Sequence, residues 1–408
     1  MKTMKIPSGW KLCKQSDVSA FYNGRAYKLS EWETEGTPVI RLQNLTGTGN
    51  EYYYSNLKLP EHQYADNGDL LYMWSATFGP KIWQGEKAIY HYHIWKVVCK
   101  DDLLDQSFMY YNLDFITESM KSKTNGSTML HFTKKGMEEH EILLPPLAEQ
   151  EKIAEYLSTV DKKIDLIDQK IAETEKLKTG LMQKLFSEGV GVQDENGNWQ
   201  PHAEFQDSPL GITIPSQWEV RQQQEVAIFY NGRAYKLSEW EESGTPVIRL
   251  QNLTGSGNKY YYSNLQLPEH QYANNGDLLF MWSATFGPKI WSGDKAIYHY
   301  HIWKVVCNEC FLSQTFMFYN LSYMTEKMKK QTNGSTMLHF TKKGMEEQLM
   351  VLPPINEQNR IAEILEAVDK KLSLLKQQKV ETQQLKKGLM QKLLTGEWRV
   401  PVEETEAA

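Results

Sequence analysis

The sequence predicts an α+β protein made of two similar α/β domains, each followed by a long helix. The 408 residues are enough for two or more domains. Segments recur at a fixed offset of 208 positions without insertion or deletion, so that FYNGRAYKLSEW at Phe21–Trp32 returns at Phe229–Trp240. In each copy, strand-like runs with turn signals come before a Pro-Pro pair, and a long stretch with helical periodicity follows it. This pattern indicates two copies of one folding unit.

The first part of each copy carries the strand signals. Residues Thr37–Leu45 and Lys87–Cys99 are rich in β-branched and aromatic residues. The second run alternates, which places His91 and His93 on one face of an expected strand. Most of the many Trp and Tyr residues here are expected in the core or on a sheet surface.

The second part of each copy predicts a coiled-coil helix that begins after the proline pair at Pro145 or Pro353. Apolar residues alternate by three and four in both copies: Ile153, Leu157, Val160, Ile164, Ile167 and Ile171, then Ile361, Leu365, Val368, Leu372 and Leu375. The pattern loosens at Thr174 and Lys178 and breaks at Lys379. Because the two seams break alike, we expect the helices to pair with each other.

The two copies have diverged unevenly. Only nine of the 79 positions in 21–99 differ from the partner copy, whereas 22 of the 38 positions in 148–185 are the same. We interpret the first block as recognising the same target in both copies, and the second as keeping only a packing pattern. A recent duplication or gene conversion is the alternative explanation.

The charge distribution changes the first impression given by the formal net charge of −6. The linker 187–208 carries five carboxylates and no Lys or Arg, and the tail 403–408 carries three more. Without those eight charges the remaining 380 residues have a net charge of +2. This weakly basic body is compatible with a nucleic-acid partner.

Composition also predicts the location of the protein. Four cysteines are too few for a disulfide scaffold, so we expect a reducing cytoplasm. No apolar run approaches the roughly 20 residues of a membrane span, and the first residues have no signal-peptide core.

No catalytic signature is found in the sequence. Phosphate-binding loops, dinucleotide fingerprints, nucleophile elbows and zinc-protease motifs are missing. Cys307 and Cys310 form a lone pair without further ligands at zinc spacing. His91 and His93 have no third ligand nearby in sequence. We therefore expect no enzyme activity, no metal and no cofactor in this chain.

Both copies share three motifs: LPP[LI]xEQ, IAExLxxVDKK and GLMQKL. This combination resembles the specificity subunit of a type I restriction-modification system. The resemblance implies two similar α/β target-recognition domains joined by two long helices that form an antiparallel coiled coil with a pseudo-two-fold internal repeat. It divides the chain into recognition domain 1 (1–142), spacer helix 1 (143–187), a linker (188–211), recognition domain 2 (212–350), spacer helix 2 (351–395) and a tail (396–408).

The resemblance also implies the function and the partners. The subunit would be non-catalytic, and its two recognition domains would read the halves of a bipartite site in double-stranded DNA. Two methylase subunits that modify adenine, together with restriction subunits, would be its partners. S-adenosylmethionine, ATP and Mg²⁺ would belong to those partners. Because the recognition blocks are nearly identical, we expect an interrupted palindrome.

Residues expected to contact DNA are polar or basic and unchanged between the copies. In the first copy they are Arg25, Lys28, Arg41, Gln43, Asn44, Ser75, Thr77, Lys81, Asn125 and Ser127. In the second they are Arg233, Lys236, Arg249, Gln251, Asn252, Ser283, Thr285, Lys289, Asn333 and Ser335. A solvated charge or a turn-former is the alternative for each.

Residues expected to be exposed and to contact the partner subunits persist in the diverging helices. They are Glu149, Gln150, Asp161, Lys162, Lys163, Glu357, Gln358, Asp369, Lys370 and Lys371. Helix capping and solvated surface are the alternative roles.

Two rival functions remain open from the sequence. One is an aromatic-rich module that binds a carbohydrate or a protein, and retention of DNA by the purified complex would distinguish it. The other is a scaffold whose coiled coil is the functional part, in which case deletion of one recognition domain would be harmless.

Overall fold

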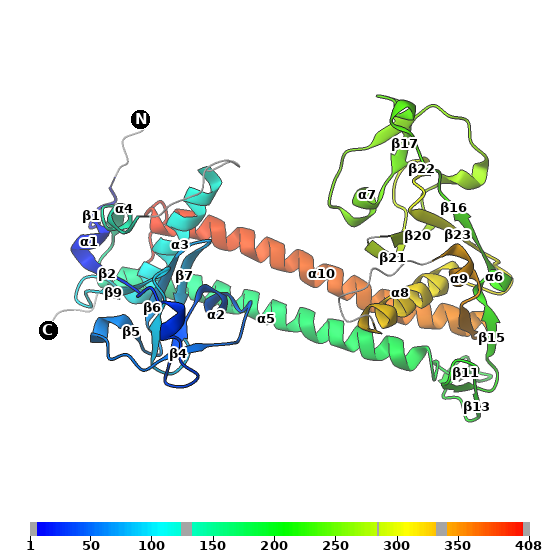
Figure 1. Ribbon diagram of the computed structural model, residues 1–408, viewed down its shortest axis with the longest axis horizontal. Helices are drawn as coiled ribbons and strands as arrows, with labels where there is room; N and C mark the ends of the chain where they lie inside the picture. Colours follow the sequence, from blue (N-terminus) through cyan, green and yellow to red (C-terminus); the bar gives the residue numbers. More distant parts are fainter. Residues whose placement is uncertain (1–5, 124–132, 284, 332–340, 403–408) are drawn as a thin grey trace. The chain divides into compact units, whose positions relative to one another are not determined.

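The computed structural model describes residues 6–123, 133–283, 285–331 and 341–402 (Figure 1). The chain forms two compact units, one made of Met1–Gln169 with Gln377–Ala408 and one made of Lys170–Lys376. Each unit combines one α/β domain with a part of each long helix. The predicted boundaries between recognition domains and spacer helices stay predictions.

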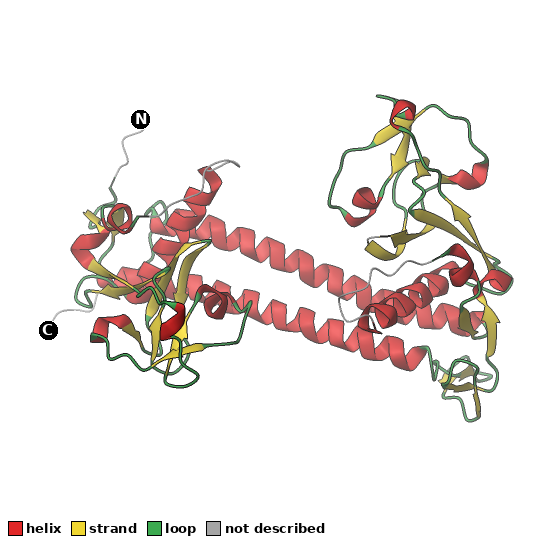
Figure 2. Ribbon diagram, viewed as in Figure 1, coloured by secondary structure: helices red, strands yellow, loops and turns green. Residues whose placement is uncertain are grey.

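The larger sheet of the first unit is antiparallel and four-stranded. Its spatial order is β2 (Ser19–Asn23), β9 (Ile94–Cys99), β6 (Leu70–Ser75) and β7 (Thr77–Ile82). Helix α3 (Gln106–Lys123) packs on β7 and β9 (Figure 2). Phe21, Tyr72 and Trp95 are buried on this sheet and belong to the main core of the unit.

A smaller sheet of the same unit has its own core, which includes Ile40, Leu71 and Tyr90. Its order is β4 (Tyr53–Ser55), β3 (Thr37–Ile40), β8 (Ala88–Tyr90) and β5 (Tyr64–Ala65), with β3 and β8 parallel.

The second unit repeats both sheets with the same strand order. The larger is β16 (Ala227–Asn231), β23 (Ile302–Cys307), β20 (Leu278–Ser283) and β21 (Thr285–Ile290), covered by α8 (Gln314–Gln331). The smaller is β18 (Tyr261–Ser263), β17 (Thr245–Ile248), β22 (Ala296–Tyr298) and β19 (Tyr272–Ala273).

Short elements complete the two units. Paired two-stranded ribbons are β1 (Lys11–Lys14) with β10 (Glu141–Leu144), β15 (Glu219–Gln222) with β24 (Leu349–Leu352), β11 (Val192–Gln193) with β12 (Trp199–Gln200), and β13 (Phe205–Asp207) with β14 (Thr213–Pro215). Short helices are α1 (Gln15–Val18), α2 (Leu42–Thr46), α4 (Lys134–Glu138), α6 (Gln223–Val226), α7 (Leu250–Thr254) and α9 (Lys342–Glu346). Single 3₁₀ turns are η1 (Leu29–Glu31), η2 (Glu61–Gln63), η3 (Leu237–Glu239) and η4 (Glu269–Gln271).

The structure corrects two strand predictions. Residues Lys87–Cys99 are not one strand, because β8 and β9 belong to different sheets and a turn at His91–Ile94 separates them. The run Thr37–Leu45 is strand only to Ile40. Helix α2 follows, since the Asn44 Oδ1 accepts a hydrogen bond from the Arg41 N–H and closes the first turn.

The predicted antiparallel helix pair is confirmed. Helix α5 spans Leu147–Leu185 and α10 spans Ile355–Leu394. In the first unit, Lys379 pairs with Asp168 and Lys386 with Asp161. In the second unit, Lys376 pairs with Glu175 and Lys178 with Asp369. As numbering falls along α10 it rises along α5, so the two helices run antiparallel within each unit.

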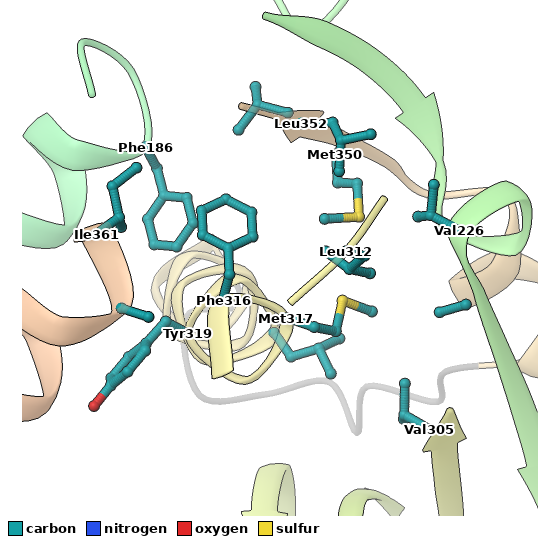
Figure 3. Close-up of a cluster of buried hydrophobic side chains, with 14 of the residues drawn as sticks. Phe186, Val226, Val305, Leu312, Phe316, Met317, Tyr319, Met350, Leu352 and Ile361 are labelled. Carbon is teal, nitrogen blue, oxygen red and sulfur yellow. The ribbon is translucent and has the colours of Figure 1, made fainter. Parts of the chain in front are cut away.

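Both long helices contribute to the core of each unit. Figure 3 shows Phe186, at the end of α5, beside Phe316 of α8, with Ile361 of α10 on the same side of the cluster. In the first unit, Ile153 and Leu157 of α5 occupy one core with Met390 and Leu393 of α10. Each α/β domain is thus anchored on the long helices by buried apolar side chains, whose removal from water stabilises the contact.

Candidate nucleic-acid interface

Three predicted DNA-contact residues lie on the β6–β7 hairpin. Ser75 and Thr77 face each other across its tip, with Ala76 alone between them. Ala76 has a φ of 57°, a left-handed conformation that is unfavourable for a residue with a Cβ atom. Lys81 is exposed further along β7. The equivalent Ser283, Thr285 and Lys289 lie on β20 and β21.

Arg25 and Lys28 differ in their availability. The Arg25 guanidinium forms an ion pair with Glu31 and lies 4.9 Å from the centroid of the Tyr27 ring. Its hydrogen bond holds the pKa of Glu31 below the ordinary value. Lys28 is exposed. The second copy repeats this arrangement with Arg233 paired to Glu239, and with Lys236 exposed.

Helix α2 gives its three predicted residues different roles. The Arg41 guanidinium lies 4.0 Å from the centroid of the Tyr53 ring and forms no ion pair with any residue that the structure describes. Gln43 is half-buried. Asn44 also donates hydrogen bonds to the backbone oxygens of Gly49 and Glu51. Arg249, Gln251 and Asn252 correspond to them.

The Asn44 side chain is therefore engaged by its own loop at both its oxygen and its nitrogen, and so is that of Asn252. These two amides hold the shape of the loop. Their contact with DNA stays a prediction. The predicted contacts Asn125, Ser127, Asn333 and Ser335 lie outside the described residues.

A half-exposed row of aromatic rings lies between Arg25 and Arg41. From the sequence, such rings were expected in the core or on a sheet surface. Tyr27 stacks on Trp32 with 4.9 Å between ring centroids, and Trp32 contacts Tyr53 at 4.6 Å. The second unit repeats the row with Tyr235, Trp240 and Tyr261. The pattern of aromatics in sequence could not distinguish this row from core, because the rings come from separate segments.

The two histidines of the turn between β8 and β9 lie close together, with ring centroids 5.0 Å apart. Burial, together with the nearby His93 and Arg41, lowers the pKa of His91 to about 4. The structure shows no cluster of three or more His, Cys, Asp or Glu side chains among the described residues that would hold a metal. These imidazoles are therefore available for hydrogen bonding as neutral groups.

The cysteines also lack metal partners within the described part of the chain. All four are free, and Cys310 is exposed. Burial raises the pKa of the Cys307 thiol to about 12, with a contribution from Glu309. A neutral thiol is a poor metal ligand and a poor nucleophile.

Four of the residues expected at an exposed subunit interface are buried. Glu149, Gln150, Glu357 and Gln358 are each at most 2% exposed. Gln150 ties the loop before α3 to the start of α5, since its amide donates to the backbone oxygens of Leu103 and Pro145 and accepts from the Asp105 N–H. Gln358 makes the same three contacts in the second unit. The expectation of exposure was wrong for these four side chains.

The two predicted aspartates are engaged within the chain. Asp161 accepts a hydrogen bond from the Tyr111 hydroxyl and pairs with Lys386. Asp369 likewise accepts from Tyr319 and pairs with Lys178. Of the ten residues expected to contact partner subunits, four lysines are exposed: Lys162, Lys163, Lys370 and Lys371.

A family model described as the type I restriction modification DNA specificity domain matches this chain twice, over residues 7–176 and 215–384. The chain belongs to this family. Each match ends within a long helix, so the family's repeating unit joins one α/β domain to part of its helix, as seen in both halves of the structure.

Curated relatives are type I restriction enzyme specificity subunits, and one of them matches almost the whole chain. The sequence is 28% identical to the type I restriction enzyme MjaVIII specificity subunit of Methanocaldococcus jannaschii, over 98% of this chain and 95% of that protein. It is 25% identical to the EcoBI specificity subunit of Escherichia coli over 46% of this chain and 40% of that protein.

Solved structures share the fold. A chain from a study of assembly and conformational transition in a type I restriction-modification system superposes with a TM-score of 0.63 at 16% identity, over 97% of this chain and all of that one. The specificity subunit from M. genitalium gives 0.54 at 16% identity, over 97% and 98% of the two chains. No helix among the described residues is long and apolar enough to cross a membrane.

Proposed function

We propose that this chain is the DNA-reading subunit of a type I restriction-modification complex, and that its two recognition domains read the halves of a bipartite site. One observation carries the proposal: the same half-exposed surface of arginine, aromatic and hydroxyl side chains is built twice, on nearly identical sequence. Arg and small polar side chains are the groups that contact phosphates and base edges.

The subunit itself contributes recognition and spacing. The antiparallel pairing of α5 and α10 would fix the gap between the half-sites. Methylation of adenine would be performed by two partner methylase subunits, and cleavage by restriction subunits. Those partner subunits would bind S-adenosylmethionine, ATP and Mg²⁺. The four free cysteines are consistent with a complex that works in the reducing cytoplasm.

The exposed lysines of the helices are the proposed contacts with methylase subunits. Lys162 and Lys163 lie on α5, and Lys370 and Lys371 occupy the equivalent positions on α10. Because the two sets are equivalent in the repeat, each would bind one methylase subunit in the same way.

The test uses a paired substitution, Lys81→Ala with Lys289→Ala, in the complete complex. Removal of a phosphate contact should reduce the dependence of log Kd on log salt by about 0.9 per lysine, so the loss of affinity is largest at low salt. Binding to a cognate duplex would be titrated between low and moderate salt concentrations.

The matched control is Lys58→Ala, because the second copy already carries the uncharged Gln266 at that position. This variant should leave the salt dependence unchanged. Equal affinity of the paired variant and the parent complex at every salt concentration would remove these lysines from the interface. Failure of the parent complex to bind any DNA sequence specifically would reject the proposed function.

A further inference from the structure

The turn between β8 and β9 connects the two sheets of the first recognition domain. A hydrogen bond of 2.9 Å from the Ile94 N–H to the His91 oxygen closes it, with Tyr92 and His93 at its corner positions. The second domain repeats the turn between β22 and β23, where Ile302 donates to His299 at 2.9 Å.

This turn is held rigidly by its surroundings. Hydrogen bonds to three other segments of the same domain anchor its backbone. The anchors are His91 N–H to the Ile40 oxygen at 2.9 Å, Tyr92 N–H to the Arg25 oxygen at 3.0 Å, Trp74 N–H to the His93 oxygen at 3.1 Å, and the Trp74 Nε1–H to the Tyr92 oxygen at 2.8 Å. The four equivalent bonds, at 2.8–3.2 Å, fix the turn of the second domain.

A glycine at the base of the turn makes this anchoring possible. A Cβ atom on Gly24 would lie 2.3 Å from the His91 oxygen and 2.4 Å from the Tyr90 oxygen, closer than real Cβ contacts. Gly232 stands in the same relation to His299 and Tyr298, at 2.3 and 2.5 Å. Both copies therefore keep the one residue that lets the FYNGR segment lie against the turn.

The polar atoms of the side chains at the corner have no hydrogen-bond partner among the described residues, although their rings contact each other. Tyr92 is 39% exposed, and its ring centroid lies 3.8 Å from that of the half-buried His93. Neither the Tyr92 hydroxyl nor the His93 ring nitrogens form a hydrogen bond with another described residue. Tyr300 is also 39% exposed and contacts His301 at 3.8 Å.

Chemistry favours a neutral hydrogen-bonding partner for this corner. Burial lowers the pKa of His93, so its imidazole is neutral at physiological pH and offers one donor and one acceptor. The Tyr92 hydroxyl also offers both. Phosphate prefers cations and donors, whereas base edges present donors and acceptors in alternation.

The corner also lies beside the hairpin already proposed to contact DNA. Trp74, which makes two of the anchoring bonds, directly precedes Ser75 at the tip of β6–β7. The unpaired guanidinium of Arg41 is close enough to His91 to lower the pKa of that imidazole. A duplex resting on the hairpin would therefore bring its bases to the turn and a phosphate to Arg41.

We propose that this turn is a base-reading element, with Tyr92 and His93 contacting base edges in the major groove. Tyr300 and His301 read the equivalent positions of the other half-site. The inference rests on the proposed DNA-reading function and adds to it the residues that determine specificity. Its rigid frame suits direct readout, which requires donors and acceptors held in fixed positions.

The experiment alters one copy at a time, so that the other copy serves as an internal control. The complete complex carrying His93→Ala is expressed in a host without other adenine methylases, and methylated positions are sequenced on single molecules. The parent complex should yield a bipartite motif. The variant should lose discrimination about 5- to 150-fold at one or two positions in one half of the motif. The other half should be unchanged.

Two further variants sharpen the result. Tyr92→Phe removes a single oxygen and should relax a position in the same half. His62→Ala is the control, because His62 is an exposed histidine of the same domain whose ring contacts Tyr22 and not Tyr92 or His93. It should leave the motif intact.

The outcomes separate the two levels of the proposal. An unchanged motif with both His93→Ala and Tyr92→Phe overturns the base-reading role while leaving the DNA-reading function in place. If His93→Ala abolishes all methylation, Tyr92→Phe decides, and an unchanged motif with that variant overturns the role. A parent complex that methylates without any sequence preference refutes the proposed function itself.

Discussion

Glu149 and Glu357 occupy equivalent positions at the start of the two long helices, yet different segments satisfy them. Glu149 accepts hydrogen bonds from the Trp10 indole at 3.0 Å and from Arg399 at 2.7 and 2.8 Å. Glu357 accepts from the Trp218 indole at 2.8 Å and from backbone N–H groups of Val190 and Gly191. A tryptophan indole donates to the glutamate in both sites. The other donors come from the C-terminal segment for Glu149 and from the linker after α5 for Glu357.

The pKa of Glu149 predicts an acid-sensitive contribution to stability. Burial alone would raise this pKa, but the hydrogen bonds from Arg399 and Trp10 outweigh burial and lower it from the ordinary value of 4.5. Because the pKa is lower in the folded state than in the unfolded state, the ionised carboxylate stabilises the fold at pH values above the ordinary pKa. This stabilisation is lost as the pH falls through the pKa of the folded state.

We expect Glu149→Gln to lower the free energy of unfolding by about 1–3 kcal/mol at pH 7, because a charge-assisted acceptor is lost. The difference should shrink below pH 4.5 as the parent carboxylate becomes protonated. Urea unfolding at a series of pH values measures both effects. Glu151→Gln, at an exposed neighbouring position, is the control. A difference that stays constant down to pH 3 would argue against this role of the carboxylate.

At the level of elements, polar residues interrupt the apolar seams of α5 and α10 at equivalent positions. Thr174 and Thr382 are buried, and Lys178 and Lys386 form ion pairs with Asp369 and Asp161 of the other helix. Polar residues in a coiled-coil seam reduce stability but fix register and orientation. We therefore expect the equivalent breaks to fix the register of α5 against α10.

Removal of one lysine should show this coupling. Lys386 pairs with both Asp161 and Asp114. Lys386→Met leaves these carboxylates without a cation and should cost about 1–3 kcal/mol of unfolding free energy. Lys386→Met combined with Asp161→Leu should recover part of that loss, as a double-mutant cycle in urea would measure. Lys387→Met, at an exposed position, is the control. Strict additivity of the two changes would mean that the pair is not coupled.

The long helices were predictable because their signals are local: a proline pair, a seam of apolar residues and its breaks. The burial of Glu149 was not, since Trp10 and Arg399 lie 139 and 250 positions away in sequence. The turn at His91–Ile94 was missed for a related reason. Its residues alternate like a strand, and its anchors Arg25, Ile40 and Trp74 come from three separate segments.

For the whole molecule, the near-identity of the two recognition domains has a direct consequence for the DNA site. Both domains keep the anchored turn, the hairpin and the aromatic row, and the nine differences in 21–99 spare all candidate contacts in that range. Two nearly identical recognition domains on one chain are expected to read two equal half-sites, as the halves of a symmetric dimer read a palindrome.

We therefore expect the methylated motif to be an interrupted palindrome. Single-molecule sequencing of N6-methyladenine in a host that carries only this system would give the motif directly. Unlike half-sites would show that the few differences between the domains, or residues outside the candidate set, determine specificity.

The division of the chain into units also orders its synthesis. The core of the first unit includes Met390, Leu393 and Val400, whereas the second unit is continuous from Lys170 to Lys376. The ribosome therefore finishes synthesis of the second unit before it has made the last core residues of the first unit. The domain translated first is the one that finishes folding last, and until residues near 400 emerge it exposes apolar surface that chaperones would need to cover.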